Sequence, residues 1–395
     1  MARGRVVGAV MVALLLPALI SGCVAADATP RPVASPRPAP PPIDPVLKYA
    51  DDRLSVMTLE EKIQSMLMLH LAGVDAGSLG AFAEVNKLGG LILMGDNIPQ
   101  SPGDLATLTP AMSAEAGLPI LLGIDQEGGV VSRVFTDTAA GADELRLLAP
   151  GASREAFASR GALLRSLGVS VNFGIVADVT GDPESFIYDR SLGSTPEDAA
   201  ARVAEAVTGE RGTVLSTLKH FPGHGVSPGD SHSSIPTTAI SLDDWRTGHE
   251  PPFAAGVAAG AEVVMFGHLQ FDAIDAQPAT LSPLWHELLR DELGFDGIII
   301  TDDMTMLQNS GRPDLADPYQ NAIRAVAAGN TMLLYVGGVD IAGVVAAVSA
   351  AVLAGTIPES VVDEAAHRIL LARRTLSGQT GQFVHCFDEC QAIIR

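Results

Sequence analysis

Residues 219–236 hold the densest group of side chains that could take part in chemistry. They read Lys219-His220-Phe221-Pro222-Gly223-His224-Gly225 and, a little further on, Asp230-Ser231-His232-Ser233-Ser234-Ile235-Pro236. The two histidines at 220 and 224 have the spacing of a zinc-binding pair on a helix, but the Pro-Gly pair between them makes a helix very unfavourable. No Cys or Glu at suitable spacing completes a metal site, so we expect none. The glycines at 223, 225 and 229 instead indicate a loop that moves, or whose backbone approaches a ligand closely.

A second candidate for chemistry is the acid at position 302. The stretch before it reads Leu288-Leu289-Arg290-Asp291-Glu292-Leu293-Gly294-Phe295-Asp296-Gly297-Ile298-Ile299-Ile300-Thr301. This pattern predicts a helix, a glycine turn and a buried strand that ends at the acid. An acid at a strand tip can be a nucleophile, a metal ligand or the N-cap of the next helix. The spacing alone leaves these roles open.

Short apolar runs must position these side chains. Several are apolar along their whole length, as expected for parallel strands buried on both faces. Helical stretches separate them, among them 199–208, 283–292 and 318–328, and a capping box at Thr58-Leu59-Glu60-Glu61 opens a helix that continues to about 65. We therefore predict an α/β fold, a single (β/α)8 TIM barrel, with a doubly wound sheet as the alternative. The predicted strands are 66–71, 90–94, 120–124, 170–173, 214–218, 263–266, 297–301 and 332–335.

The barrel prediction says where a site should lie. Active sites of such barrels gather at the C-terminal ends of the strands. In this sequence those ends carry Asp125, Asp178, Lys219-His220, His268 and Asp302-Asp303. Random placement would scatter polar residues over both ends and over the helices. We therefore expect a pocket lined by carboxylates and histidines, and hence an enzyme.

Composition excludes several classes of protein. The 395 residues contain 25 Lys+Arg against 46 Asp+Glu, a formal net charge of −21, which argues against a nucleic-acid partner. Hydrophobic residues make up 47%, too many for a disordered chain. Aromatic residues make up only 5%, so the core must be mainly aliphatic. Three cysteines are too few for a disulfide scaffold.

The first 45 residues have the pattern of an export signal followed by a tether. Arg3 and Arg5 precede an apolar run over 6–20 and then Ser21-Gly22-Cys23, as in a secretory signal peptide. Residues 19–23 also resemble a bacterial lipobox, in which Cys23 becomes the lipidated first residue; an ordinary signal peptide is the alternative. The Pro-rich residues that follow indicate a semi-rigid extended tether. The predicted organisation is a signal peptide over 1–22, a tether over 23–45, a barrel domain over 46–380 and a tail over 381–395, with the protein lipid-anchored at the outer face of the cell membrane.

The two stretches that carry the candidate catalytic residues, 219–236 and 288–302, together resemble a known family. The helix, Gly-Phe-Asp-Gly turn, strand and Thr301-Asp302 resemble the nucleophile signature of glycoside hydrolase family 3. The stretch from Lys219 to His232 is similar to that of its β-N-acetylglucosaminidase (NagZ-type) branch, in the lipoprotein form of mycobacteria and related actinobacteria. The resemblance runs from about 51 to about 374.

The resemblance implies a role for each matching residue. It implies that Asp302 is the catalytic nucleophile, that His232 is the general acid/base and that Asp230 is the partner of His232. Asp303 is expected to be structural. The matching sugar-binding positions are Asp125, Arg133, Arg190, Lys219 and His220. Gly174 stands where the family usually has Ala.

The implied activity is retaining exo-hydrolysis of terminal β-linked N-acetylglucosamine from GlcNAc–MurNAc cell-wall fragments. An imidazole suits the acid/base role because it exchanges protons near neutral pH with little tuning. The glycines around 225–229 suggest that the dyad swings in over bound sugar. Alternatives are a β-glucosidase or GlcNAc phosphorylase on the same barrel, and a catalytically silent sugar-binding lipoprotein.

The remaining expectations concern cofactors and the tail. We expect no cofactor, because side chains fill the nucleophile, acid/base and sugar-binding roles. Cys386 and Cys390 lie beyond the resemblance and are expected to be either free thiols or a disulfide closing a short loop, which would stabilise the fold only slightly. The sequence does not specify an oligomeric state.

Overall fold

Eight parallel strands form a barrel in the computed structural model, which describes residues 44–227, 229–386 and 390–392. In order around the barrel they are β1 (Leu67–Leu69), β2 (Gly90–Leu93), β3 (Leu121–Ile124), β4 (Val171–Val176), β5 (Leu215–Phe221), β7 (Val263–Phe266), β10 (Ile298–Thr301) and β11 (Leu333–Tyr335). β11 pairs in parallel with β1, and the backbone N–H of Thr301 donates to the carbonyl of Met332 at 3.1 Å, which joins β10 to the start of β11. The predicted (β/α)8 barrel is confirmed.

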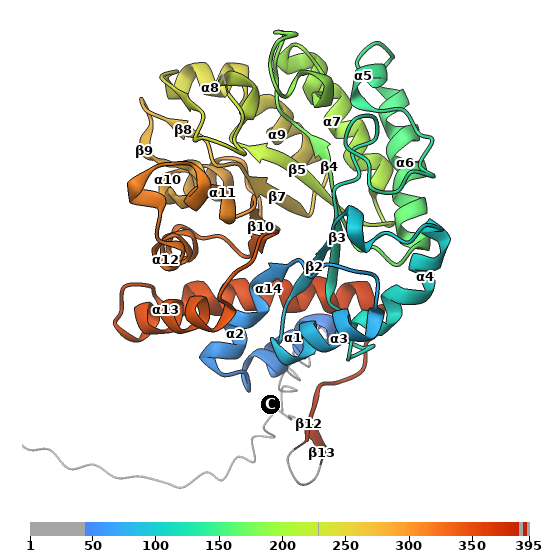
Figure 1. The fold of residues 1–395 in the computed structure, drawn as a ribbon, viewed down its shortest axis with the longest axis vertical. Helices are drawn as coiled ribbons and strands as arrows, with labels where there is room; N and C mark the ends of the chain where they lie inside the picture. The colour runs from blue at the N-terminus through green and yellow to red at the C-terminus, as the bar shows by residue number, and fades with distance from the viewer. Residues whose placement is uncertain (1–43, 228, 387–389, 393–395) are drawn as a thin grey trace, which may run out of the picture. The chain divides into compact units, whose positions relative to one another are not determined.

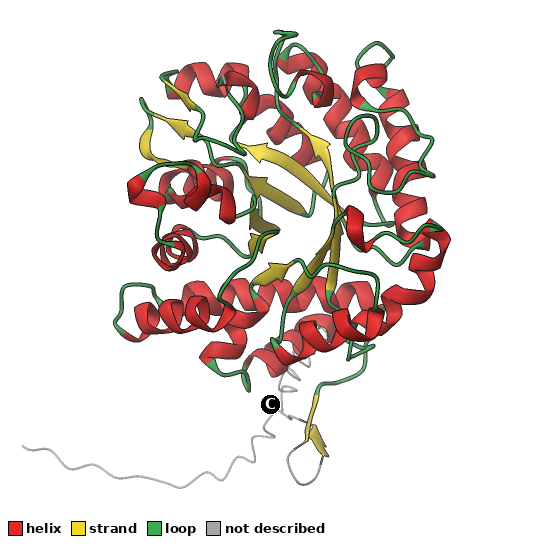
Figure 2. Cartoon of the chain, in the orientation of Figure 1, coloured by secondary structure: helices red, strands yellow, loops and turns green. Residues whose placement is uncertain are grey.

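Helices surround these strands (Figures 1 and 2). Those of the first half are α1 (Pro45–Leu54), α2 (Leu59–Ser65), α3 (Ala76–Val85), α4 (Leu105–Leu108), α5 (Ala142–Leu145), α6 (Gly151–Ser166) and α7 (Pro196–Glu210). Those of the second half are α8 (Leu242–Gly248), α9 (Glu250–Ala258), α10 (Pro283–Glu287), α11 (Thr305–Asn309), α12 (Pro318–Ala328), α13 (Ile341–Leu353) and α14 (Glu359–Ser377). The predicted capping box is present: Thr58 accepts from the backbone N–H of Glu61, and the Glu61 carboxylate accepts from that of Thr58.

The structure extends or divides several predicted elements. β4 and β5 each run three residues beyond the predicted end, so Lys219 and His220 belong to β5 and do not follow it. The helix predicted over 283–292 divides into α10 and a π-helical turn, Leu288–Glu292. Two small additions had no counterpart in the prediction: a sheet of β6 (Thr237–Thr238), β8 (Gln270–Phe271) and β9 (Asp275–Pro278), and a hairpin of β12 (Val384–Cys386) and β13 (Cys390–Ala392).

The core has an aliphatic and an aromatic part. Residues of β1, β2, β3 and the helices packed on them form a cluster of Leu, Ile, Val and Met, as the composition predicts. A second cluster on the β5 and β7 side contains both tryptophans of the chain and most of the buried phenylalanines. Phe221, at the end of β5, packs edge to face on Trp245, Phe253 and Trp285. The scarce aromatic side chains therefore support the strand end that carries Lys219 and His220.

The first helix and the C-terminal tail meet. Tyr49 of α1 packs edge to face on Phe383, with ring centroids 5.6 Å apart. The guanidinium of Arg374 lies 3.9 Å from the Tyr49 ring centroid and donates to the carbonyl of Gly381 at 2.6 Å. These contacts fasten the tail to α1 as far as residue 383.

The predicted N-terminal segments are largely outside the described residues. This holds for the signal peptide, for Cys23 and for all but two residues of the tether. Among the described residues, no helix combines the length and apolar character needed to cross a bilayer. The predicted boundaries at 46 and 380 stay predictions.

Candidate active site

Side chains from the C-terminal ends of four strands meet, as the barrel prediction requires. Asp125 follows β3 directly, Asp178 lies two residues beyond β4, Lys219 is near the end of β5, and Asp302 follows β10 directly. The Lys219 ammonium donates to the Asp125 carboxylate at 2.8 Å across 94 residues of sequence. Parallel strands bring such distant residues together because their C-terminal ends share one edge of the barrel.

Glu127 is the centre of the charged part of the site. Lys219 Nζ lies 2.7 Å from its Oε1, while Arg190 donates to both oxygens, at 2.7 Å from Nη2 and 3.0 Å from Nε. The side chains of Lys219 and Glu127 are only 2% and 4% exposed. Burial by itself would raise the pKa of Glu127, but the two cations outweigh it and lower that pKa to about 2. Burial likewise opposes the charge of Lys219, yet the two carboxylates raise its pKa above the ordinary value.

His220 is held in one orientation by Asp178. The imidazole Nδ1 lies 2.7 Å from Asp178 Oδ2, and the other carboxylate oxygen accepts from the backbone N–H groups of His220 at 3.2 Å and His224 at 2.6 Å. On the other side of the ring, Nε2 is 3.4 Å from Arg190 Nη2, which can only donate. The bond to Asp178 therefore assigns a proton to Nδ1 and fixes the orientation of the ring, with Nε2 on the side of Arg190. The peptide bond before His220 is cis.

Asp302 is a half-buried carboxylate held at the barrel rim. Its backbone N–H donates to the carbonyl of Phe266 at 2.8 Å, and its Oδ1 accepts from the backbone N–H of Asp303 at 2.7 Å. Burial would raise the pKa of Asp302, but the neighbouring rings of His220 and His268 and the Asp303 N–H outweigh burial and lower it. Asp302 is therefore ionised at neutral pH, as a nucleophile must be.

Asp303 has a structural position, as expected from the sequence. Its carboxylate accepts from the backbone N–H groups of Thr305 and Val336, at 3.0 and 3.1 Å, and from the Thr305 hydroxyl at 2.6 Å. Its carbonyl accepts from Nε2 of the buried His268 at 2.9 Å. Asp303 thereby fixes the chain between β10 and α11.

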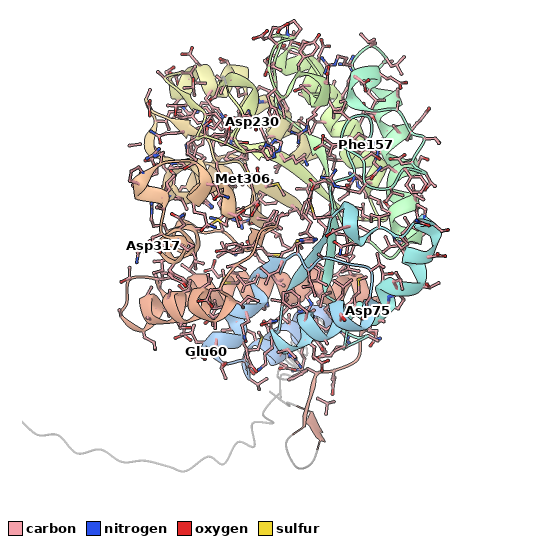
Figure 3. The ribbon with its side chains drawn as sticks, in the orientation of Figure 1. Glu60, Asp75, Phe157, Asp230, Met306 and Asp317 are labelled. Carbon is pink, nitrogen blue, oxygen red and sulfur yellow. The ribbon has the colours of Figure 1, made fainter. Side chains whose placement is uncertain are left out.

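The dyad lies on the loop that joins β5 to β6, where Figure 3 labels Asp230. His232 Nδ1 is 2.6 Å from Asp230 Oδ1, which also accepts from the His232 backbone N–H at 2.9 Å. The side chains are 64% and 43% exposed. Burial would raise the pKa of Asp230, but the two bonds from His232 outweigh it and lower the pKa. The predicted pairing of Asp230 with His232 is present, with the ring nitrogen Nε2 pointing away from the pair.

Arg133 is the predicted site residue whose side chain has the fewest polar contacts with the protein. Its backbone N–H donates to Gln126 Oε1 at 2.8 Å. Among the described residues its guanidinium forms no hydrogen bond or ion pair with the protein. Its assignment to sugar binding stays a prediction.

The sequence placed Asp178 in the predicted pocket without a specific role, and it assigned no site role to Glu127 or His224. Glu127 stands two residues after Asp125, and a pair of acids just past a strand was the available signal. Asp178 was recognised as a residue at a strand end, but nothing in the sequence pairs it with His220. His224 is buried, its pKa is lowered by burial, and its ring packs 5.9 Å from that of His220.

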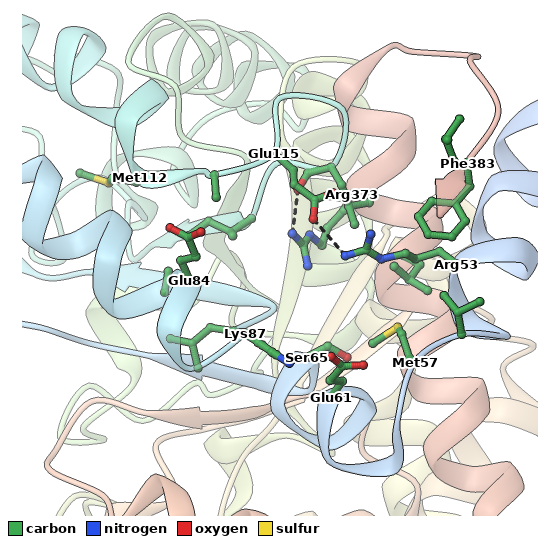
Figure 4. Close-up of a pocket in the computed structure, with 18 residues that line it drawn as sticks. Arg53, Met57, Glu61, Ser65, Glu84, Lys87, Met112, Glu115, Arg373 and Phe383 are labelled. Carbon is green, nitrogen blue, oxygen red and sulfur yellow. Dashed lines mark hydrogen bonds and ion pairs between the residues drawn. The ribbon is translucent and has the colours of Figure 1, made fainter. Parts of the chain in front are cut away.

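A cavity of about 630 Å³ lies at the opposite end of the barrel (Figure 4). Its walls include Ser65, Leu88 and Ile120, which stand just before β1, β2 and β3, so it opens near the N-terminal ends of the strands. Two of its cations form ion pairs, Arg53 with Glu115 and Lys87 with Glu61, and Arg373 donates to backbone carbonyls. None of the predicted site residues lines it, and the N-terminal face of such a barrel normally serves stability.

Among the described residues, no group of three or more His, Cys, Asp or Glu side chains is arranged to hold a metal ion. The arrangement instead offers an ionised acid at a rigid strand tip, a cluster of paired cations and anions, and an exposed Asp–His pair. Such a set can hold a polyhydroxylated ligand and perform acid/base and nucleophilic chemistry on it.

Comparison with known proteins gives consistent matches. The model of the glycosyl hydrolase family 3 N-terminal domain matches residues 58–372. The chain is 31% identical over 349 residues to the β-hexosaminidase LpqI of Mycobacterium tuberculosis, covering 84% of this chain and 88% of the relative.

Solved structures agree with this. A family 3 β-N-acetylglucosaminidase of Paenibacillus sp. superposes with a TM-score of 0.76 at 31% identity, over 84% of this chain and 65% of that chain. The structure of M. tuberculosis LpqI superposes with a TM-score of 0.72 at 30% identity, over 81% of this chain and 95% of that chain.

Proposed function

This chain belongs to glycosyl hydrolase family 3, and we propose from that premise that it is a retaining exo-β-N-acetylglucosaminidase. The observation that carries the proposal is the ionised Asp302 at the tip of β10, beside the Lys219–Glu127–Arg190 cluster. The names of its relatives, β-hexosaminidase and β-N-acetylglucosaminidase, support the reaction class.

The first step forms a covalent sugar–enzyme ester. A carboxylate oxygen of Asp302 attacks the anomeric carbon while the bond from that carbon to the leaving oxygen breaks. His232 gives its Nε2 proton to the leaving oxygen, so the aglycone departs as a neutral alcohol. Asp230 keeps the other ring proton on Nδ1 and stabilises the imidazolium before the transfer.

The second step returns the enzyme to its starting state. The imidazole of His232, now neutral, takes a proton from water, and the water oxygen attacks the anomeric carbon from the face that the aglycone left. The ester bond to Asp302 breaks and frees the carboxylate. Two inversions at one carbon give net retention of the β configuration.

The sugar is held by groups that are already arranged before it binds. Asp125, with its side chain 18% exposed, accepts hydrogen bonds from hydroxyls, while Lys219 holds it in place. Arg133 and Arg190 offer donors, and His220 is the remaining sugar-binding residue that we propose. Because ion pairs already fix Asp125 and Arg190, little ordering of these two side chains remains to oppose binding.

The natural substrate that we propose is the GlcNAc–MurNAc fragment of the cell wall, met outside the cell membrane. The support is the family together with the signal-like N-terminus.

Lipidation at Cys23 would hold the enzyme at the outer face of the cell membrane. Replacing Cys23 with Ala should move the protein from the membrane fraction to the soluble fraction and abolish incorporation of labelled palmitate; an unchanged distribution would contradict the anchor.

The central test is cleavage of a chromogenic β-GlcNAc substrate by wild type and Asp302→Ala. We expect turnover by the wild type and loss of at least about 10³-fold in the variant, since the nucleophile is removed. Asp243→Ala, at a side chain 93% exposed, is the matched control and should keep full activity. A fluorinated GlcNAc inactivator should leave a glycosyl group on the peptide that contains Asp302.

Product analysis separates the remaining alternatives. GlcNAc 1-phosphate formed in the presence of phosphate would identify a phosphorylase, and faster turnover of the β-glucoside than of the β-GlcNAc compound would identify a glucosidase. No turnover of any aryl glycoside would indicate a sugar-binding protein and would refute the proposal.

A further inference from the structure

The acid/base histidine of the proposed mechanism has few contacts of its own. Its side chain is 64% exposed, and its hydrogen bonds are to Asp230, two residues away on the same loop. Asp230 is itself 43% exposed. Proton transfer to a leaving oxygen requires the imidazole within hydrogen-bond reach of that oxygen. Something outside the loop must therefore set where the ring stands.

Among the described residues, one ring from another segment contacts His232. The ring of Phe186 lies 5.6 Å from that of His232, centroid to centroid, at an interplanar angle of 74°. The same ring also lies 5.6 Å from that of His224, at an angle of 43°, and 5.6 Å from the Arg190 guanidinium. Phe186 thus connects the exposed dyad with the buried His224 and the largely buried Arg190.

The backbone that carries Phe186 is firmly held. The next residue, Ile187, is fully buried, and its carbonyl accepts from the hydroxyl of Ser191 at 3.0 Å. Three residues on, Arg190 is fixed by its two bonds to Glu127. Phe186 nevertheless remains 41% exposed, so the anchored segment presents its ring at the surface beside the dyad. Burial alone does not account for a phenylalanine at this place.

We propose that Phe186 is a positioning residue for His232: its ring seats the imidazole of the dyad at the rim of the site. This inference rests on the proposed function, because it assigns Phe186 to the acid/base step of that reaction. The edge-to-face contact restricts the rotamers of the imidazole without touching either nitrogen, so Nε2 stays free for the leaving oxygen. A ring displaced by about 1 Å would lose much of its effect on proton transfer.

The test compares two substrates of Phe186→Ala that differ only in their leaving group. A 2,4-dinitrophenyl β-GlcNAc glycoside leaves without help from an acid, whereas a 4-methylphenyl glycoside needs protonation. The quantity measured is the ratio of kcat/KM for the poor leaving group to kcat/KM for the good one, because effects common to both substrates cancel in it. We expect this ratio to fall by roughly 10- to 100-fold in the variant.

Two further variants separate the contact from general damage. Phe186→Tyr keeps an aromatic edge against His232 and should retain a ratio close to that of the wild type. Leu353→Ala removes another exposed apolar side chain, 81% exposed on α13, and should leave both the ratio and the melting temperature unchanged. Because Phe186 is partly exposed, Phe186→Ala should also fold with an unchanged melting temperature.

An equal loss of kcat/KM on both substrates, or a rise in KM alone, would overturn the proposal and indicate that Phe186 stacks on the sugar. A second measurement does not need turnover: the imidazole proton resonances of His232 should shift in Phe186→Ala, because the neighbouring ring is gone. Unchanged resonances would overturn the inference even in an active enzyme. If the wild type cleaves neither glycoside, the proposed function is wrong. The His232 resonances then still test whether Phe186 contacts His232.

Discussion

Replacing Glu127 with Gln is the sharpest perturbation of this site, because one carboxylate there satisfies two buried cations. The substitution keeps the size of the side chain and removes its charge. Lys219 would keep the Asp125 carboxylate as a partner at 2.8 Å, whereas Arg190 would lose its ion pair and one of its two bonds to residue 127, where a single amide oxygen would remain to accept. The expected result is a less stable protein whose arginine is no longer fixed.

The size of the loss follows from the pKa of Glu127. In the folded protein that pKa is about 2, against an ordinary value of 4.5. At 1.36 kcal/mol per unit, the difference corresponds to roughly 3 kcal/mol of stability at pH 7. Breaking buried ion pairs in other proteins costs about 3–5 kcal/mol, which is of the same size.

The pKa of Glu127 also predicts how the loss of stability depends on pH. Because folding lowers the pKa of Glu127, its contribution to the free energy of unfolding is complete above about pH 4.5 and disappears as the pH falls towards about 2. The stability difference between wild type and Glu127→Gln should therefore shrink from roughly 3 kcal/mol at pH 7 to about 2 kcal/mol at pH 3.5.

Urea denaturation at the two pH values measures this difference. Glu205→Gln is the control, because it breaks the surface pair of Glu205 with Arg154 and should cost at most about 1 kcal/mol. Activity should fall as well, since Arg190 loses its orientation. A difference below about 1 kcal/mol at pH 7, or one that does not change with pH, would refute the assignment of Glu127 as the electrostatic centre of the site.

Three further substitutions probe the surroundings. Asp178→Asn replaces one of the two oxygens that together accept from the ring and the backbone of His220, so kcat/KM should fall by roughly 10²-fold in steady-state assays; unchanged kinetics would contradict the orienting role. Burial raises the pKa of Glu210 to about 8, so the folded state binds its proton more tightly than the unfolded state. Wild type should accordingly lose stability as the pH rises from about 4.5 to about 8, and Glu210→Gln should flatten that slope in denaturation curves; equal slopes would count against it. Gly174→Ala would place a methyl group 2.2 Å from Asn172 Nδ2 and 2.7 Å from a backbone carbonyl, so a loss of about 1–3 kcal/mol is expected from urea denaturation; wild-type stability would show that the strand adjusts freely.

Hydropathy predicted the barrel because all eight of its strands are short and buried on both faces. It ended β5 three residues early, because Lys219 and His220 are polar yet belong to the strand, where their partners Asp125, Glu127 and Asp178 satisfy them. The π-helical turn after α10 has no hydropathy signal, so a continuous helix was predicted.

The charged residues of the site were only partly predictable. Strand-end positions pointed to Asp125, Lys219 and His220 without knowledge of their contacts. Glu127 was missed because its partner Arg190 is 63 residues away, and no local pattern encodes such a pairing. Phe186 had no signal either, because an exposed phenylalanine in an irregular segment looks like any surface residue. The catalytic roles of Asp302, Asp230 and His232 came from resemblance and stay proposals.

The contact of Tyr49 with Phe383 has a mechanical consequence. A pulling force applied between α1 and residue 383 would act on two neighbouring points of the domain, because the rings of Tyr49 and Phe383 are in contact. Such a force would peel the tail from α1 and leave the hydrogen bonds between barrel strands without tension. An enzyme pulled at its ends could therefore lose its last contacts with the tail and still keep its barrel closed.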